Sequence, residues 1–408
     1  MDLQTIRDMD AADPLRAFRD RFDLPAGVVY LDGNSLGALP KATAARLADV
    51  VSREWGQDLI RSWNKNHWIE APRRLGGKIA RLIGAKTHEV VAADSTSINV
   101  FKALSAAVQL RPDRTIILSE TGNFPTDAYM MQGLAALSGG RIEQKLLPAA
   151  EIPAALDAQV AVLLLTQTHY KTGRLHDMAA LTRAAHEAGA LVIWDLSHSA
   201  GALPVDLNGC EADFAVGCGY KYLNGGPGAP AFLFCAERHH EQVFPALSGW
   251  LGHADPFAFK DAYEPGKGID RFQCGTPGIL GMAALECGLD LMLEADMAAI
   301  RAKSAALGDL FIALTEECLT GFELASPREA TQRGSQVSIR HEQGYAIMQA
   351  LIARGVIGDF RAPDILRFGF TPLYTRYEDV WLAIEALADI MQTGEWREPR
   401  FATRSAVT

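Results

Sequence analysis

Residues 194–234 have the sequence WDLSHSAGALPVDLNGCEADFAVGCGYKYLNGGPGAPAFLF. The segment joins three short apolar runs, LVIWD (191–195), DFAVGC (213–218) and AFLFC (231–235). Continuous apolar runs bounded by turn residues are typical of strands buried in a sheet. Polar residues follow at once, His198 after the first run and Lys221 after the second. Because ligands of open α/β sheets collect beyond the carboxyl ends of the strands, the segment predicts a sheet with a binding site at its edge.

The chain before this segment continues the same pattern. Four more runs indicate strands: VVAAD (90–94), TIILS (115–119), RIEQKLL (141–147) and QVAVLLLT (159–166). Apolar residues at helical spacing indicate helices between them, at 98–110, 126–137 and 178–188. Repeated alternation of strand and helix predicts an α/β fold with a mostly parallel, seven-stranded sheet between helices.

The pattern changes after about residue 278. A long helix is expected at 279–296, and short strands are expected near 336–340, 355–360 and 365–370. This mixture predicts a smaller α+β domain. We therefore expect three parts: an N-terminal segment at 1–50 that packs on the small domain, a large domain at 51–290 and a small domain at 291–408.

Composition excludes several classes of protein. The 408 residues are 49% apolar and 22% charged, as in ordinary soluble globular proteins. The net charge of −10 disfavours binding to nucleic acid or anionic membranes. No apolar stretch approaches the ~18 residues of a membrane span. The first 14 residues, MDLQTIRDMDAADP, carry four acidic side chains, so a signal peptide is not expected.

The cysteines and histidines do not predict a metal site. Six cysteines occur without a CxxC pair, which favours reduced, buried thiols in a cytoplasmic protein: Cys210, Cys218, Cys235, Cys274, Cys287 and Cys318. His239 and His240 are adjacent, a spacing unsuited to one helix face, and we expect them at the surface.

The residues that follow the predicted strands form a chemically coherent set. Thr96 and Ser97 begin a helix, and helix N-termini bind phosphate. Phe124 offers an aromatic face, Asp195 a carboxylate and Lys221 an amine. Each alone has an ordinary alternative, as a helix cap, core side chain, turn residue or solvated charge. Together they suit pyridoxal phosphate, whose phosphate, pyridine nitrogen and aldehyde require a helix N-terminus, a carboxylate and a lysine.

Several motifs resemble those of the kynureninase family, within the fold-type I pyridoxal-phosphate enzymes of the aminotransferase class V superfamily. Besides residues 194–234 they are YLDGNSLGALP (30–40), DSTSINVFK (94–102), NFPTD (123–127), THYKTGRLHDM (168–178), QCGTP (273–277) and LRFGFTPLY (366–374). The resemblance covers residues 30–385 in the family's order. It implies a large cofactor-binding domain and a small C-terminal domain.

The resemblance also implies a role for each matching residue. Lys221 would carry the cofactor and move the substrate's α-proton, Asp195 would pair with the pyridinium nitrogen, and Tyr220 would donate a proton. The implied cofactor-binding residues are Thr96, Ser97, Phe124, Asp127, Thr166, Asp195, His198, Tyr220 and Lys221, with Trp250 and Thr276 contributed across a homodimer interface. Arg367 would bind the α-carboxylate, and Ser35, Asn34 and Trp63 would lie near the aryl group.

The implied reaction is hydrolysis of L-kynurenine to anthranilate and L-alanine through an external aldimine and a ketimine, in tryptophan degradation. Whether 3-hydroxykynurenine is preferred stays open. The main alternatives are a cysteine desulfurase or an aminotransferase on the same fold. A desulfurase needs a reactive cysteine on a mobile loop, whereas we expect Cys318 on a buried helix face. A DNA-binding regulator is disfavoured because the first 50 residues are short and acidic.

Overall fold

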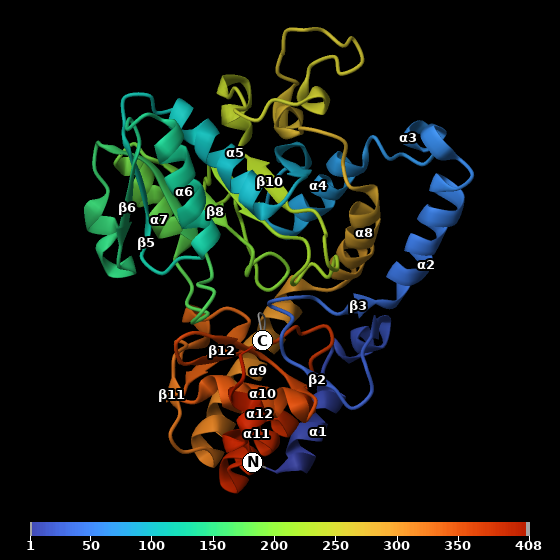
Figure 1. Cartoon of the computed structure of the whole chain (residues 1–408), viewed down its shortest axis with the longest axis vertical. Helices are drawn as coiled ribbons and strands as arrows, with labels where there is room; N and C mark the ends of the chain where they lie inside the picture. The colour runs from blue at the N-terminus through green and yellow to red at the C-terminus, as the bar shows by residue number, and fades with distance from the viewer. Residues whose placement is uncertain (1, 405–408) are drawn as a thin grey trace.

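The computed structural model describes residues 2–404. Its centre is a seven-stranded sheet ordered β4-β10-β9-β8-β7-β5-β6 (Figure 1). These strands are β4 (Val90–Ala92), β5 (Ile116–Glu120), β6 (Glu143–Leu147), β7 (Val160–Thr166), β8 (Leu191–Asp195), β9 (Phe214–Gly217) and β10 (Phe232–Cys235). Only β10 runs antiparallel to its neighbours, and β6, β5, β7, β8 and β9 pair in parallel. The prediction of a mostly parallel α/β sheet is confirmed.

Both faces of the central strands β7 and β8 are buried, which explains their continuous apolar runs, whereas the edge strand β6 is partly exposed. Leu163 and Val192 pack into a core on one face, while Val162 and Ile193 pack into a core on the other. Successive side chains of a strand point to opposite faces, so a strand covered on both sides must be apolar throughout. The helices around the sheet are α4 (Ala71–Leu82), α5 (Thr96–Gln109), α6 (Pro125–Leu137), α7 (Met178–Glu187) and α8 (Ile279–Glu294).

A second core is built around a small antiparallel sheet ordered β11-β12-β15-β14. Its strands are β11 (Glu323–Leu324), β12 (Gln336–Arg340), β14 (Asp359–Arg361) and β15 (Ile365–Gly369), and its helices are α9 (Met297–Cys318), α10 (Gly344–Ala353), α11 (Tyr377–Thr393) and α12 (Pro399–Ala402). Phe311 of α9 packs on Phe368 of β15 with ring centroids 4.7 Å apart. Figure 1 shows this part below the large sheet.

The N-terminal segment contacts both parts. Ile6 of α1 (Leu3–Ala12) lies in the second core, and β2 (Val29–Tyr30) pairs in parallel with β13 (Val356–Ile357). The chain then forms a short pair of strands, β1 (Phe22–Asp23) with β3 (Leu39–Pro40). Helix α2 (Lys41–Asp49) continues as a π-helical turn, leads to α3 (Ser62–Lys65), and runs beside α8 (Figure 1). The segment therefore passes from the small sheet to the edge of the large one.

Two expectations about individual side chains are wrong. His239 and His240 are buried, because their short helix packs on the sheet: His239 Nε2 lies 2.7 Å from Asp213 Oδ1, and His240 Nε2 lies 2.8 Å from the Cys235 carbonyl. Cys318 is exposed, because α9 ends at this residue and the helix face leaves the core there. Within residues 2–404, no helix is both long and apolar enough to cross a membrane.

Candidate active site

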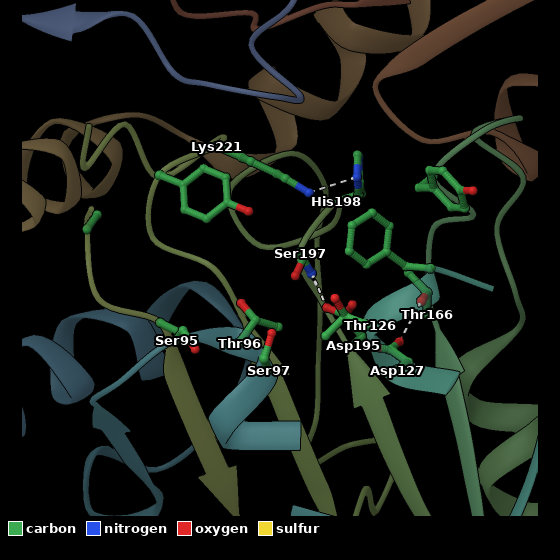
Figure 2. A pocket seen from close by; sticks show the side chains of 15 residues that line it. Ser95, Thr96, Ser97, Thr126, Asp127, Thr166, Asp195, Ser197, His198 and Lys221 are labelled. Carbon is green, nitrogen blue, oxygen red and sulfur yellow. Dashed lines mark hydrogen bonds between the residues drawn. The ribbon is translucent and has the colours of Figure 1, made fainter. Parts of the chain in front are cut away.

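A cavity of ≈ 310 Å³ lies beyond the carboxyl ends of the central strands (Figure 2). The loops after β4, β5, β7, β8 and β9 supply its walls, as expected for an open α/β sheet. Nine predicted cofactor-binding residues line this one cavity: Thr96, Ser97, Phe124, Asp127, Thr166, Asp195, His198, Tyr220 and Lys221. Side chains separated by 125 positions in the chain therefore share one pocket.

Lys221 projects into the cavity from the turn after β9. Its Nζ lies 3.0 Å from His198 Nε2 and 5.8 Å from the centroid of the Phe124 ring. Burial lowers the pKa of Lys221, so its amine is more readily deprotonated than that of a surface lysine. Gly37 of the N-terminal segment holds this turn: its N–H donates to the Tyr220 carbonyl at 2.8 Å, and a Cβ there would lie 2.4 Å from the Lys221 carbonyl oxygen.

Asp195 ends β8 and is buried at the base of the cavity. Its Oδ1 accepts a hydrogen bond of 2.7 Å from the Ser197 N–H, and in residues 2–404 it forms no ion pair. Burial raises the pKa of Asp195, since water no longer solvates the charged form. A cation placed against this carboxylate would stabilise its ionised form.

Asp127 supports this region from the start of α6. Its Oδ2 accepts hydrogen bonds from Asn123 Nδ2 at 3.2 Å and from Thr166 Oγ1 at 3.3 Å. Burial, and then the charge of Asp195, raise the pKa of Asp127 well above its usual range. Two carboxyl groups this close favour one proton between them, unless a cation lies near.

Unpaired polar atoms test whether a phosphate-bearing aromatic cofactor fits. Thr96 Oγ1, Asp127 Oδ1 and His198 Nδ1 are buried and have no hydrogen-bond partner among the described residues. Thr96 and Ser97 begin α5, where free backbone N–H groups attract an anion. Lys221 lies on the far side of the cavity from them (Figure 2), and Phe124 also lines the cavity. The donor set fits pyridoxal phosphate.

Comparison with known proteins agrees with this site. Residues 300–387 match the model of the kynureninase C-terminal domain. The chain is 55% identical to kynureninase from Burkholderia mallei strain SAVP1 over 407 residues, 98% of each chain, and 51% identical to that from Pseudomonas fluorescens, again over 98% of each. The chain belongs to the kynureninase family.

Solved structures show how widely the fold of this kynureninase-family protein is shared. The cysteine desulfurase CsdA from Escherichia coli superposes with a TM-score of 0.78 at 20% identity, covering 93% of this chain and 98% of that one. A C-DES mutant with glycine linked to its pyridoxal-phosphate cofactor gives the same score at 18% identity, covering 91% and 99%. At such identities the likeness establishes the fold alone.

Arg367 is buried beside the cavity and already has several partners. Its Nε donates to Asp359 Oδ1 at 2.8 Å, its Nη1 to the Tyr170 carbonyl at 2.7 Å and its Nη2 to Ser35 Oγ at 2.9 Å. Tyr170 lines the cavity and meets the Phe124 ring edge-on at 5.2 Å. Neither Tyr170 nor Asp359 was among the predicted site residues. Tyr170 lies within the quoted THYKTGRLHDM motif, which was a usable signal, whereas nothing marked Asp359.

Six predicted residues do not line the cavity: Arg367 and Ser35, described above, and Asn34, Trp63, Trp250 and Thr276. Asn34 is fully buried, and neither side-chain amide atom has a partner in the described part of the chain. Trp63 packs edge-on against Trp68 at 6.0 Å. Trp250 is 39% exposed, and Thr276 lines a separate hollow of ≈ 240 Å³. The assignment of the last two residues to a second chain stays a prediction.

Proposed function

We propose that this protein hydrolyses L-kynurenine to anthranilate and L-alanine with pyridoxal phosphate as its cofactor. The observation that carries the proposal is the buried Lys221 amine, which shares one cavity with the Phe124 ring, the Asp195 carboxylate and the start of α5. Relatives named kynureninase that match 98% of the chain support the same substrate. When bound, pyridoxal phosphate supplies an electron sink that weakens bonds at the α- and β-carbons of an amino acid.

The residues of the cavity fit this cofactor in a single orientation. The α5 N-terminus with Thr96 and Ser97 would hold the phosphate, and Phe124 would stack on the ring. Asp195 would face the pyridine nitrogen, where the raised pKa of the carboxyl favours sharing a proton with it. Lys221 would hold the aldehyde carbon covalently. Asp127 lies near Asp195, and it would add to the negative potential around the pyridine nitrogen.

Two side chains are suited to move protons. The Lys221 Nζ, when free, is a base whose pKa burial has lowered, and it would exchange the proton of the substrate α-carbon. Burial, and then the neighbouring Cys218, raise the pKa of Tyr220 far above neutrality, so its phenol stays protonated. We assign Tyr220 as the acid that protonates the alanine precursor. His198 stays neutral, since burial and the Lys221 charge lower its pKa.

The remaining polar groups would orient the substrate. Arg367 would bind an α-carboxylate because its guanidinium stays positively charged and forms charge-assisted hydrogen bonds. It lies behind Tyr170, and its positive charge contributes to the lowered pKa of Lys221. Candidates to contact the aryl group of the substrate are Ser35, Asn34 and Trp63. The preference between kynurenine and its 3-hydroxy form depends on that side.

Product analysis tests the proposed reaction. Purified protein with pyridoxal phosphate and L-kynurenine should form anthranilate and alanine in equal amounts, without any added keto acid. Transfer of the amino group to pyruvate with no anthranilate would leave the aminotransferase alternative. Release of sulfur from cysteine as the main reaction would leave the desulfurase alternative, for which the exposed Cys318 on α9 is the candidate to replace by serine.

We also propose a cytoplasmic homodimer whose active sites are completed across the interface. Large apolar side chains are exposed where the N-terminal segment and residues 250–260 extend from the large sheet: Trp55, Leu59, Ile60, Trp250, Phe257 and Phe259. Ile60 is 77% and Phe259 76% exposed, which is unfavourable unless another surface covers them. Six free cysteines suit a reducing compartment. We divide the subunit at 51–290 and 291–408, with residues 1–50 on the small domain.

A further inference from the structure

A cluster of four charged groups, two of them buried and two half-buried, lies next to the substrate side of the cavity. Arg361 and Asp359 come from β14, Arg367 comes from β15, and Asp32 comes from the loop after β2. Arg361 Nη2 lies 2.7 Å from Asp359 Oδ2, and Arg367 Nε lies 2.8 Å from Asp359 Oδ1. When all four are ionised, two positive charges balance two negative charges.

Most hydrogen-bonding capacity of Arg367 is already used within this cluster. A guanidinium has five N–H donors. Asp359 takes one from Nε and one from Nη2, Ser35 Oγ takes the second from Nη2, and the Tyr170 carbonyl takes one from Nη1. One donor remains on Nη1, the nitrogen that donates to the carbonyl of Tyr170, and Tyr170 lines the cavity. A substrate carboxylate would therefore approach Arg367 while Asp359 still neutralises its other edge.

Asp32 is the one carboxylate of the cluster without a strong partner. Its Oδ1 is buried and, within residues 2–404, has no hydrogen-bond partner. The groups that face it are Asp359, Arg361 and Arg367 from the small sheet, Ser35 from its own loop, and the phenols of Tyr30, Tyr222 and Tyr374. Burial, followed by the charge of Asp359, raises the pKa of Asp32 to about 7, although both arginines and Ser35 act in the opposite direction.

We propose that Asp32 binds one proton from water when the substrate α-carboxylate binds to Arg367. The inference rests on the proposed function, because that reaction supplies the carboxylate. A third negative charge in this largely desolvated cluster with two arginines would be uncompensated, and removing an unpaired charge from water is costly. Protonation of Asp32 would neutralise this extra negative charge. Of the two carboxylates in the cluster, Asp32 is the one without a hydrogen-bonded cation, so it accepts a proton more readily than Asp359. By linkage, carboxylate binding should then weaken as pH rises through the pKa of Asp32.

The test uses the cofactor-loaded enzyme and 4-oxo-4-phenylbutanoate, an aryl ketone carboxylate without an amine. Since the probe has no group that titrates near neutrality, proton exchange on binding reports the protein. Calorimetry in two buffers of different ionisation enthalpy should show proton uptake by the wild-type enzyme at pH 7.5. Affinity should fall above about pH 7, by up to about tenfold for each pH unit. This measurement needs no variant.

Asp32→Asn mimics the protonated carboxyl and gives the sharpest contrast. It should remove the proton uptake and the pH dependence, and at pH 8.5 it should bind the probe about tenfold more tightly than wild type. The pH dependence of kcat/KM for kynurenine above pH 7 should flatten likewise, with kcat little changed. Asp10→Asn is the control, because Asp10 also has a carboxyl pKa raised by burial but accepts from the N–H groups of Tyr377 and Glu378 at the start of α11.

The possible failures can be told apart. Absence of anthranilate from wild-type enzyme would refute the proposed function. Normal anthranilate formation without proton uptake, or with an Asp32→Asn profile that follows the wild-type profile, would refute the role of Asp32 alone. Weaker probe binding by Asp32→Asn at every pH would also refute it, since a damaged site loses affinity whereas loss of the charge should increase affinity.

Discussion

At the scale of single residues, we assign two roles to the Lys221 amine: attachment of the cofactor and transfer of the substrate's α-proton. Replacing it with alanine should abolish the visible absorption of lysine-linked cofactor and reduce turnover by at least about a thousandfold, because both attachment and proton transfer are lost. Absorption spectra after addition of pyridoxal phosphate check the first effect, and an anthranilate assay checks the second. Lys171→Ala is the control and should keep the absorption band. Borohydride reduction and peptide mapping that placed the cofactor on another lysine would contradict the assignment.

A conservative substitution of Arg367 is the appropriate test, because removal of its charge would leave the buried Asp359 with Arg361 as its remaining ion-pair partner. Arg367→Lys keeps the charge but lacks the planar set of donors that holds Asp359, Ser35 and the Tyr170 carbonyl while one donor stays free for the substrate. We expect kcat/KM for kynurenine to fall by more than tenfold, mainly through KM, with an unchanged cofactor spectrum. Steady-state kinetics beside visible spectra measure both. A near-normal KM would assign the α-carboxylate to another residue.

At the scale of elements, Asp213 joins three segments at the amino end of the large sheet. It precedes β9 and accepts hydrogen bonds from His186 of α7 at 2.8 Å, from Arg238 at 2.7 Å and from the Val192 N–H at 2.8 Å. Burial alone would raise the pKa of Asp213, but the hydrogen bonds from its histidine neighbours lower it far below the ordinary value. The folded state therefore favours the ionised carboxylate.

The sign of the pH effect follows from that lowered pKa. The stability supplied by Asp213 should be complete above the unfolded-state value of about 4 and lost as pH falls below it. Asp213→Asn should thus destabilise the protein by about 3–5 kcal/mol at pH 7, with a smaller difference at lower pH. Urea unfolding at pH 7 and at about pH 3, below the unfolded-state value, measures this. Exposed Asp113→Asn should leave the unfolding midpoint unchanged, and an equal Asp213→Asn effect at both pH values would contradict the argument.

At the scale of the whole molecule, the surface has an exposed aromatic segment and a hollow that are separate from the cavity around Lys221. Exposed aromatic side chains gather at residues 250–259, and Thr276 lines a hollow apart from the cavity of its own chain. If two subunits complete each other's sites, inactive Lys221→Ala protein mixed with inactive Thr276→Ala protein should regain activity through hybrid dimers. Up to about one quarter of the wild-type sites would be restored, because half of the subunits pair with the other variant and each such dimer has one intact site. Fully active monomers in sedimentation would exclude this arrangement.

The strands of the large sheet could be predicted from local sequence, because the apolar runs of its central strands match burial on both faces of the sheet. The run at 159–166 is apolar throughout and lies in a strand buried on both faces. At the ends of elements, the local sequence pattern did not predict whether a side chain is buried. The helical spacing of Cys318 suggested a core position, but α9 ends there and its last residue is exposed. The adjacent histidines 239 and 240 looked like surface residues, yet their short helix packs on the sheet.

The sequence by itself also determined which side chains follow the strands, and the parallel sheet necessarily brings Asp195 and Lys221 to one edge. Only the tertiary structure decided the second set of contacts, in which Asp32 and Ser35 meet Asp359 and Arg367 from more than 300 positions away. No periodicity encodes such a meeting, because it depends on how the N-terminal segment crosses the small sheet. The charge balance around Arg367 is for that reason a property of the folded chain: it arises from burial and proximity, which single residues do not possess.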